Sequence, residues 1–198
     1  VHLGTGNYHA GTARAYTDFG LLTCDRDIGE DVHRLFLQLT GLGRVARLKK
    51  LRQSPFTLQR QLIALIDAEA ENARKGKPAR IVAKMNALSE PRIIQALYRA
   101  SQAGVSIDLI VRGICCLRPG VPRVSENIRV RSVIGRFLEH SRVFHFEAGG
   151  EKLVFLASAD WMQRNFFSRV EALFPVLDER VKARVIGEGL EAYLADNT

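Results

Sequence analysis

Two apolar runs decide the fold of this chain: Ala79-Arg80-Ile81-Val82-Ala83-Lys84-Met85 and Val105-Ser106-Ile107-Asp108-Leu109-Ile110-Val111. The second run is almost continuously apolar, which is typical of a buried parallel strand. Between the two runs, Ser89-Glu90-Pro91 predicts the start of a helix and Gly104 predicts its end. A strand, a helix and a second strand in this order predict a βαβ unit.

The same analysis extends to both sides of this unit. On the N-terminal side, residues 13–24 are typical of a strand, and apolar spacing predicts helices over residues 25–40 and from Ser54-Pro55 to about Lys75. On the C-terminal side we expect strands over residues 128–133, 141–147, 152–158 and 168–176, and a helix over residues 178–194. The predicted fold is therefore α/β, with a mixed, mostly parallel sheet flanked by helices.

Composition limits the classes of partner and the location. The formal net charge is +8 and the isoelectric point is about 9.8, which favours polyanions such as nucleic acid, polyphosphate, nucleotides or acidic lipid headgroups. The sequence contains no run of about eighteen apolar residues, which is the length that a membrane-spanning helix requires. The cysteines, Cys24 and the adjacent Cys115-Cys116, have neither zinc-ligand spacing nor an even number, and they suit a reducing compartment.

Phosphate chemistry is indicated by Phe137-Leu138-Glu139-His140-Ser141-Arg142, followed later by Ser158-Ala159-Asp160-Trp161. An imidazole can attack or protonate a phosphoryl oxygen, and a guanidinium can hold the other oxygens of the group. A nearby carboxylate can orient the imidazole ring. The alternative interpretation is an exposed stretch of polar residues without a function.

Part of this arrangement occurs twice at equal spacing. The blocks matched at equal spacing are Gly4-Thr5-Gly6 with Ala157-Ser158-Ala159, Asn7-Tyr8 with Asp160-Trp161, and Tyr16-Thr17-Asp18 with Arg169-Val170-Glu171, and an apolar pair follows in both copies, Leu21-Leu22 and Leu173-Phe174. Such a repeat predicts two halves of a pseudo-symmetric site. Because the first copy lacks its own histidine-x-cation element, we expect the chain to be part of a longer protein.

A ligand is expected at the ends of the two apolar strands, because ligands of open α/β sheets bind outside the carboxyl ends of the strands. Arg112 directly follows the second strand, so its charge would face the ligand unless it pairs with a local carboxylate. Lys84-Met85-Asn86 stands at the equivalent end of the first strand, where it would either contact phosphate or shape the turn.

Taken together, these residues resemble the class 1 polyphosphate kinases, whose two catalytic domains resemble halves of phospholipase D. The blocks that carry the resemblance are Val1–Tyr8, Thr12–Asp18, Val111–Cys115, Arg136–Arg142 and Ser158–Met162. It covers essentially the whole chain and implies the C-terminal part of such an enzyme. Residues 1–43 would be the tail of a preceding phospholipase D-like catalytic domain, and residues 44–198 a complete phospholipase D-like α/β domain.

The resemblance implies reversible transfer of the ATP γ-phosphate to inorganic polyphosphate through a phosphohistidine. That histidine lies in a family element upstream of His2, so the chain alone is expected to be inactive. By position, His140 matches the second catalytic histidine, which also contacts ATP, while Tyr16 and Arg112 match ATP-binding residues and Arg169 matches a phosphate contact. We further expect Arg136, Arg142 and Arg164 to line a polyphosphate channel, and Asn7 and Asp160 to shape the site.

The resemblance also implies cofactors and partners. Mg²⁺ is expected to be bound by ligands outside this chain, with no metal ligand within it. The expected partners are ATP or ADP, inorganic polyphosphate and further copies of the same enzyme, with no nucleic acid. The implied location is cytoplasmic, with peripheral membrane association as a further expectation. Two alternatives remain at this point: a phospholipase D-like phosphodiesterase acting on nucleic acid or phospholipid, and a non-catalytic basic module that binds polyanions.

Overall fold

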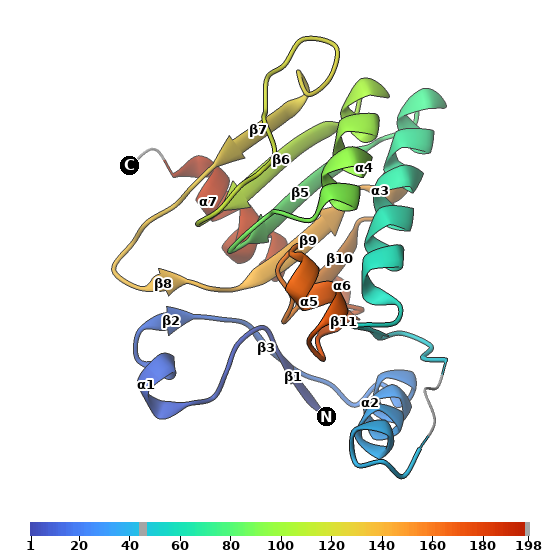
Figure 1. The fold of residues 1–198 in the computed structure, drawn as a ribbon, viewed down its shortest axis with the longest axis vertical. Coiled ribbons are helices and arrows are strands. Elements are labelled where there is room, and N and C mark those ends of the chain that lie inside the picture. Colours follow the sequence, from blue (N-terminus) through green and yellow to red (C-terminus); the bar gives the residue numbers. More distant parts are fainter. Residues whose placement is uncertain (44–46, 197–198) are drawn as a thin grey trace.

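One seven-stranded sheet forms the centre of the computed structural model, which describes residues 1–43 and 47–196 (Figure 1). The strands lie in the order β4-β11-β10-β9-β5-β6-β7. Their bounds are β4 Arg52–Gln53, β5 Arg80–Met85, β6 Ser106–Val111, β7 Ile128–Arg131, β9 Arg142–Phe146, β10 Leu153–Ala157 and β11 Ala172–Pro175.

The predicted βαβ unit is confirmed. Strands β5 and β6 pair in parallel and are connected by helix α4 (Pro91–Gln102), which Glu90 caps by accepting from the Ile93 N–H at 2.7 Å. Gly104 follows this helix with a φ of 93°, a conformation that glycine adopts without strain.

The sheet is mixed, as predicted, but the expectation that it is mostly parallel is wrong. Only β5, β6 and β7 pair in parallel, whereas β5, β9, β10, β11 and β4 form a run of antiparallel pairs. For the pair β9 and β10, the cause is the length of the connection. The chain between Phe146 and Leu153 contains only a 3-10 turn (Ala148–Gly150) and is too short for a parallel crossover.

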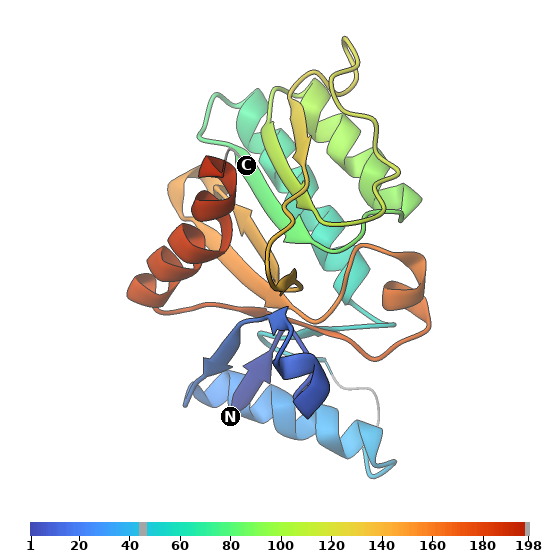
Figure 2. The same ribbon diagram turned by 90° about the vertical axis from the view of Figure 1, so that its left-hand side faces the viewer.

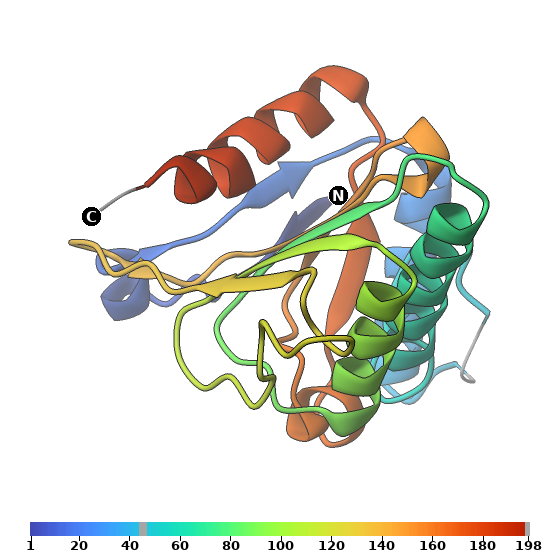
Figure 3. The same cartoon turned by 90° about the horizontal axis from the view of Figure 1, so that it is seen from above.

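Helices cover both faces of the sheet (Figure 3). Helix α3 (Leu58–Arg74) packs with α4 on one face, and the C-terminal helical segment packs on the other. That segment consists of α6 (Glu179–Ile186), a π-helical stretch (Gly187–Glu191) and α7 (Ala192–Ala195), in place of the single helix predicted over residues 178–194. Side chains alternate between the two cores along each strand, so that Ile81 and Ala83 of β5 face α3 and α4 while Val82 faces the C-terminal segment.

The N-terminal segment lies beside one edge of this layered body (Figures 1 and 2). Its elements are β1 His2–Gly4, α1 Ala10–Ala13, β2 Tyr16–Thr17, β3 Gly20–Leu22 and α2 Arg26–Leu39. Strands β1 and β3 pair antiparallel in a two-stranded sheet, and β2 pairs in parallel with β8 (Leu138–Glu139). The single strand predicted over residues 13–24 is therefore wrong, because β2 and β3 pair with different partners.

Helix α2 confirms the helix predicted over residues 25–40, and Asp25 caps it by accepting from the Ile28 N–H at 2.9 Å. The predicted helix start at Ser54-Pro55 is wrong, since the Ser54 N–H donates to the Glu171 carbonyl and continues the β4 pairing, so that α3 begins at Leu58. The predicted domain boundary after residue 43 falls on residues outside the described ranges. No helix among the described residues is long and apolar enough to cross a membrane.

Candidate active site

His140 occupies the junction between the N-terminal segment and the sheet. It follows β8 and precedes β9, and its Nδ1 lies 3.0 Å from Asp18 Oδ2. The imidazole also packs against the ring of Tyr16, with ring centroids 5.0 Å apart. The pairing of β2 with β8 explains this meeting, because Tyr16 and Thr17 stand opposite Leu138 and Glu139.

The Asp18 carboxylate determines which nitrogen of His140 carries a proton. Burial raises the pKa of Asp18, but hydrogen bonds from His140 and Thr5 and the charge of Arg142 outweigh it, so the pKa lies below its usual value. An ionised carboxylate can only accept, and therefore Nδ1 is the donor. Arg142 Nη1 is also 3.2 Å from Nδ1, but it donates to the Thr5 carbonyl at 2.9 Å.

Arg142 and Asp160 form a buried ion pair beneath the histidine. Arg142 Nε donates to Asp160 Oδ1 at 3.1 Å, and Nη2 donates to Oδ2 at 2.9 Å. Burial raises the pKa of Asp160, but the bonds from Arg142 and Asn86 outweigh it and the pKa is lowered. Because Arg142 also binds Thr5, it connects the N-terminal segment to the sheet. Its contact with polyphosphate stays a prediction.

Asn86 links this ion pair to Arg112. Its backbone N–H donates to Asp160 Oδ1 at 2.7 Å, and its side-chain oxygen accepts from Arg112 Nε at 2.8 Å. Among the described residues Arg112 pairs with this neutral amide and with no carboxylate, so its guanidinium charge remains available to an anion. Asn86 also lines the second cavity described below, so its contact with phosphate stays a prediction, while Lys84 is buried in the core.

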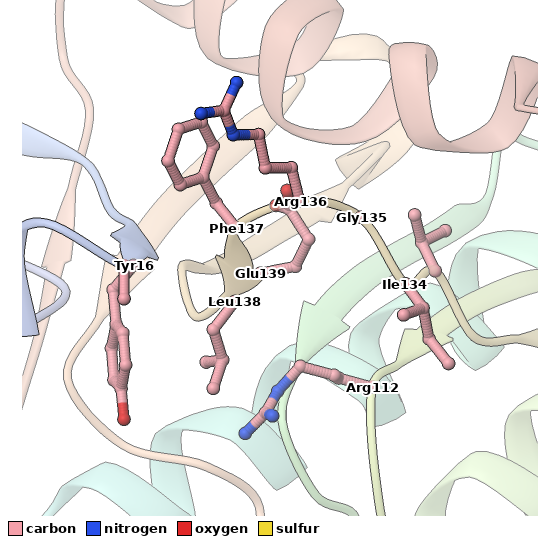
Figure 4. A pocket seen from close by; sticks show the side chains of 10 residues that line it. Tyr16, Arg112, Ile134, Gly135, Arg136, Phe137, Leu138 and Glu139 are labelled. Carbon is pink, nitrogen blue, oxygen red and sulfur yellow. The ribbon is translucent and has the colours of Figure 1, made fainter.

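Two cavities meet at Tyr16 and Arg112. The first has a volume of about 450 Å³ and is largely apolar, and residues 133–139 form one wall of it (Figure 4). In Figure 4, the Tyr16 ring and the Arg112 guanidinium extend to the same side, with Leu138 between them. The second cavity has a volume of about 370 Å³, and its polar lining includes His140, Asp160 and four arginines: Arg112, Arg142, Arg164 and Arg169.

The structure thus brings most of the predicted site residues together, with two exceptions. Arg136 lines the first cavity, but its guanidinium lies over the Phe137 ring and points away from Arg112 (Figure 4). Asn7 is exposed and is not among the residues that line either cavity. Sequence reasoning assigned no role to Asp18, although the repeat had already marked it as a matched acidic position.

The predicted repeat is present as a set of equivalent hydrogen bonds. The Thr5 N–H donates to the Phe19 carbonyl at 3.0 Å, the Phe19 N–H donates to Thr5 Oγ1 at 3.0 Å, and the Thr5 hydroxyl donates to Asp18. Ser158 makes the same three bonds, with the Ala172 carbonyl at 3.0 Å, with the Ala172 N–H at 3.1 Å, and with Glu171. Glu171 therefore corresponds to Asp18, and the two copies present equivalent carboxylates.

Comparison with known proteins identifies the fold. Nuc from Salmonella typhimurium, a phospholipase D family member, superposes with a TM-score of 0.50 at 16% identity, over 70% of this chain and 89% of that chain. The fold is therefore phospholipase D-like, a mixed sheet between helical layers.

The particular family follows from closer matches. The model of polyphosphate kinase C-terminal domain 2 matches residues 51–198, and that of C-terminal domain 1 matches residues 1–45. The chain belongs to the polyphosphate kinase family, as its motifs predicted. It is 64% identical to the polyphosphate kinase of Paraburkholderia phytofirmans and 63% identical to that of Burkholderia cenocepacia (strain HI2424), covering all of this chain and 29% of each relative.

A solved structure covers nearly the whole chain. The crystal structure of polyphosphate kinase from Porphyromonas gingivalis superposes with a TM-score of 0.94 at 46% identity, over 99% of this chain and 30% of that chain. This chain therefore corresponds to the C-terminal part of a polyphosphate kinase and spans less than a third of the length of these relatives.

Proposed function

We propose that this chain supplies one half of an active site that transfers the ATP γ-phosphate reversibly to inorganic polyphosphate through a phosphohistidine. The observation that carries this proposal is the cavity that holds His140, with its Asp18 partner, among four arginines. Guanidinium groups neutralise the charge that moves onto oxygen during phosphoryl transfer. His140 lines this cavity and would exchange a proton with a phosphate oxygen.

The two adjoining cavities suggest how ATP lies in the site. The apolar cavity suits the nucleoside, with Tyr16 packing against the base. The triphosphate would then pass Arg112, which lines both cavities, and enter the arginine-lined cavity. Arg164 and Arg169 line the second cavity but not the first, and we expect them to contact the terminal phosphates or the end of the polyphosphate chain.

The repeat supports a second histidine at this site. Asp18 accepts from His140 Nδ1, and Glu171 occupies the equivalent place in the other copy. We expect Glu171 to orient an imidazole in the same way, and the spacing of the repeat places the counterpart of His140 before residue 1. The proposed phosphohistidine would therefore belong to a segment upstream of His2, and this chain alone would not turn over.

Magnesium is proposed to act from outside this chain. Asp18 and Asp160, the acidic residues beside the cavity, are already engaged by His140 and Arg142, so they do not suit a divalent cation. Formation of homo-oligomers, absence of nucleic acid as a partner, cytoplasmic location and peripheral membrane association are further predictions for the full-length protein.

Calorimetry of ATP and polyphosphate binding at two salt concentrations tests the proposal. We expect Arg112→Ala to weaken ATP binding by about tenfold or more, and His140→Ala to abolish transfer in the full-length protein. Arg99→Ala is the control, because Arg99 pairs with Asp67 on the surface of α4 and α3. Polyanion binding that falls steeply with salt and ignores both site variants would instead favour a basic binding module. Cleavage of an activated phosphodiester without ATP would favour a phosphodiesterase.

A further inference from the structure

One buried ammonium group binds both sequence neighbours of His140. Lys84 lies on β5, where side-chain alternation places it on the same face as Val82, toward the C-terminal helical segment. Its side chain is 2% exposed. Its Nζ donates to Ser141 Oγ at 2.6 Å and to Glu139 Oε2 at 3.4 Å. The backbone of His140 is therefore held on both sides by a single cation.

The C-terminal helical segment completes this arrangement through Tyr193. The Tyr193 hydroxyl donates to Glu139 Oε2, which also accepts from Thr17 at 2.8 Å. The ammonium of Lys84 lies over the Tyr193 ring, 4.4 Å from its centroid. Burial and the adjacent Glu139 carboxylate raise the pKa of Tyr193, so the phenol stays a donor. We refer to Lys84, Glu139, Ser141 and Tyr193 as the Lys84 cluster.

A close backbone approach brings this segment against both parts of the site. A Cβ atom at Gly189 would lie 3.0 Å from the Phe19 ring and 3.3 Å from Val143. Phe19 directly follows Asp18, and Val143 directly follows Arg142. The lack of a side chain at Gly189 thus allows the helical segment that carries Tyr193 to pack closely on both residues.

From these contacts we propose that Lys84 and Tyr193 are positioning residues for His140. Through Tyr193, the C-terminal helical segment contributes to the geometry of the active site. The expected effect on turnover rests on the proposed function. That Lys84 and Tyr193 hold His140 in position does not depend on that function. A catalytic imidazole needs neighbours whose own conformations are fixed, and displacement by about 1 Å can cost a hundredfold in rate. Neither residue lines the arginine-lined cavity, so they act through His140 and not on substrate.

Two variants test this assignment, each with a matched control. Tyr193→Phe removes only the hydroxyl that donates to Glu139, and Lys84→Met removes the ammonium while retaining most of the volume. Tyr98→Phe removes a hydroxyl on α4 that accepts from the Arg118 N–H, and Lys182→Met removes a largely buried lysine from the same helical segment. In the full-length protein we expect kcat to fall about tenfold in Tyr193→Phe and more in Lys84→Met, with little change in the KM for ATP.

NMR of the 198-residue chain labelled at its five histidines separates the structural claim from the function. The Tyr16 ring lies 5.0 Å from the His140 imidazole, so ring-current shifts report their mutual position. We expect the His140 ring signal, assigned with His140→Gln, to move in both cluster variants and to stay in place in both controls. An unmoved signal in a folded Tyr193→Phe chain would overturn the inference, as would unchanged kcat. If the full-length protein lacks the proposed activity while the signal moves, only the proposed function fails.

Discussion

His140 Nδ1 lies 3.0 Å from Asp18 Oδ2, although the two residues are 122 positions apart in the chain. The histidine belongs to the sheet domain and the carboxylate to the N-terminal segment. The two units therefore share one acid–base pair, and the site exists only where they meet.

Replacing Asp18 by Asn should reduce transfer while leaving the fold intact. The substitution hardly changes the volume of the side chain. The amide can, however, present its NH₂ group to His140 and so favour the wrong tautomer of the imidazole ring. We expect kcat of the full-length protein to fall by about a hundredfold or more. Asp67→Asn, which alters an exposed ion pair with Arg99, is the control. Wild-type kcat in a folded Asp18→Asn protein would contradict the assigned role of the carboxylate.

Glu171→Gln should affect a different step, because Glu171 stands at the position equivalent to Asp18 in the other copy. If it orients the upstream histidine, loss of its charge should suppress formation of the phosphoenzyme by about tenfold or more. The measurement is acid-labile label on the protein after mixing with γ-labelled ATP. Glu179→Gln, at a side chain that is 79% exposed, serves for comparison. Normal labelling in Glu171→Gln would argue against the second histidine site.

The Arg142–Asp160 pair should contribute to stability at neutral pH. Asp160→Asn leaves a buried guanidinium without its carboxylate, and we expect a loss of about 3–5 kcal/mol in the free energy of unfolding. Because the folded pKa of Asp160 is lowered, the wild-type contribution is present above the unfolded value of 3.8 and is lost as pH falls through the folded pKa. Denaturant unfolding from pH 7 to pH 3 would measure both effects, and a stable Asp160→Asn chain would refute them.

A second pH effect should come from His145, which is buried on β9 with its Nε2 lacking a hydrogen-bond partner. Burial lowers its pKa to about 4, and the charges of Arg80 and Lys152 act in the same direction. Between pH 6.5 and 4 the unfolded chain binds a proton that the folded chain does not.

The free energy of unfolding should therefore rise with pH across this window, by at most about 3 kcal/mol. His145→Phe should remove the dependence, whereas His33→Phe on the exposed face of α2 should retain it. The free energy of unfolding is measured by denaturant at each pH. If it depends on pH equally in the His145→Phe and wild-type chains, His145 is not the cause of the dependence.

Features set by local sequence could be predicted, and those set by distant contacts could not. The helix after Ser89-Glu90-Pro91 is indicated by adjacent residues at its start. The repeat around Thr5 and Ser158 is indicated by equal spacing of matching residues. The antiparallel half of the sheet depends on which distant strands pair. The same is true of Lys84, whose partners Ser141 and Tyr193 are not marked by any pattern near it.

The parallel pairing of β2 with β8 also has a kinetic consequence. Thr17 and Glu139, which stand opposite each other, are 122 positions apart, so the loop that this pairing closes contains strands β4 to β7. Such a contact gains free energy only after the intervening chain has become compact, because closing a long flexible loop costs entropy. Synthesis of the chain must also pass residue 140 before the two units can meet. The acid–base pair is therefore expected to assemble late in folding, as is the pairing of β4 with β11 within the sheet, where Arg52 and Leu173 are nearly as far apart in the chain.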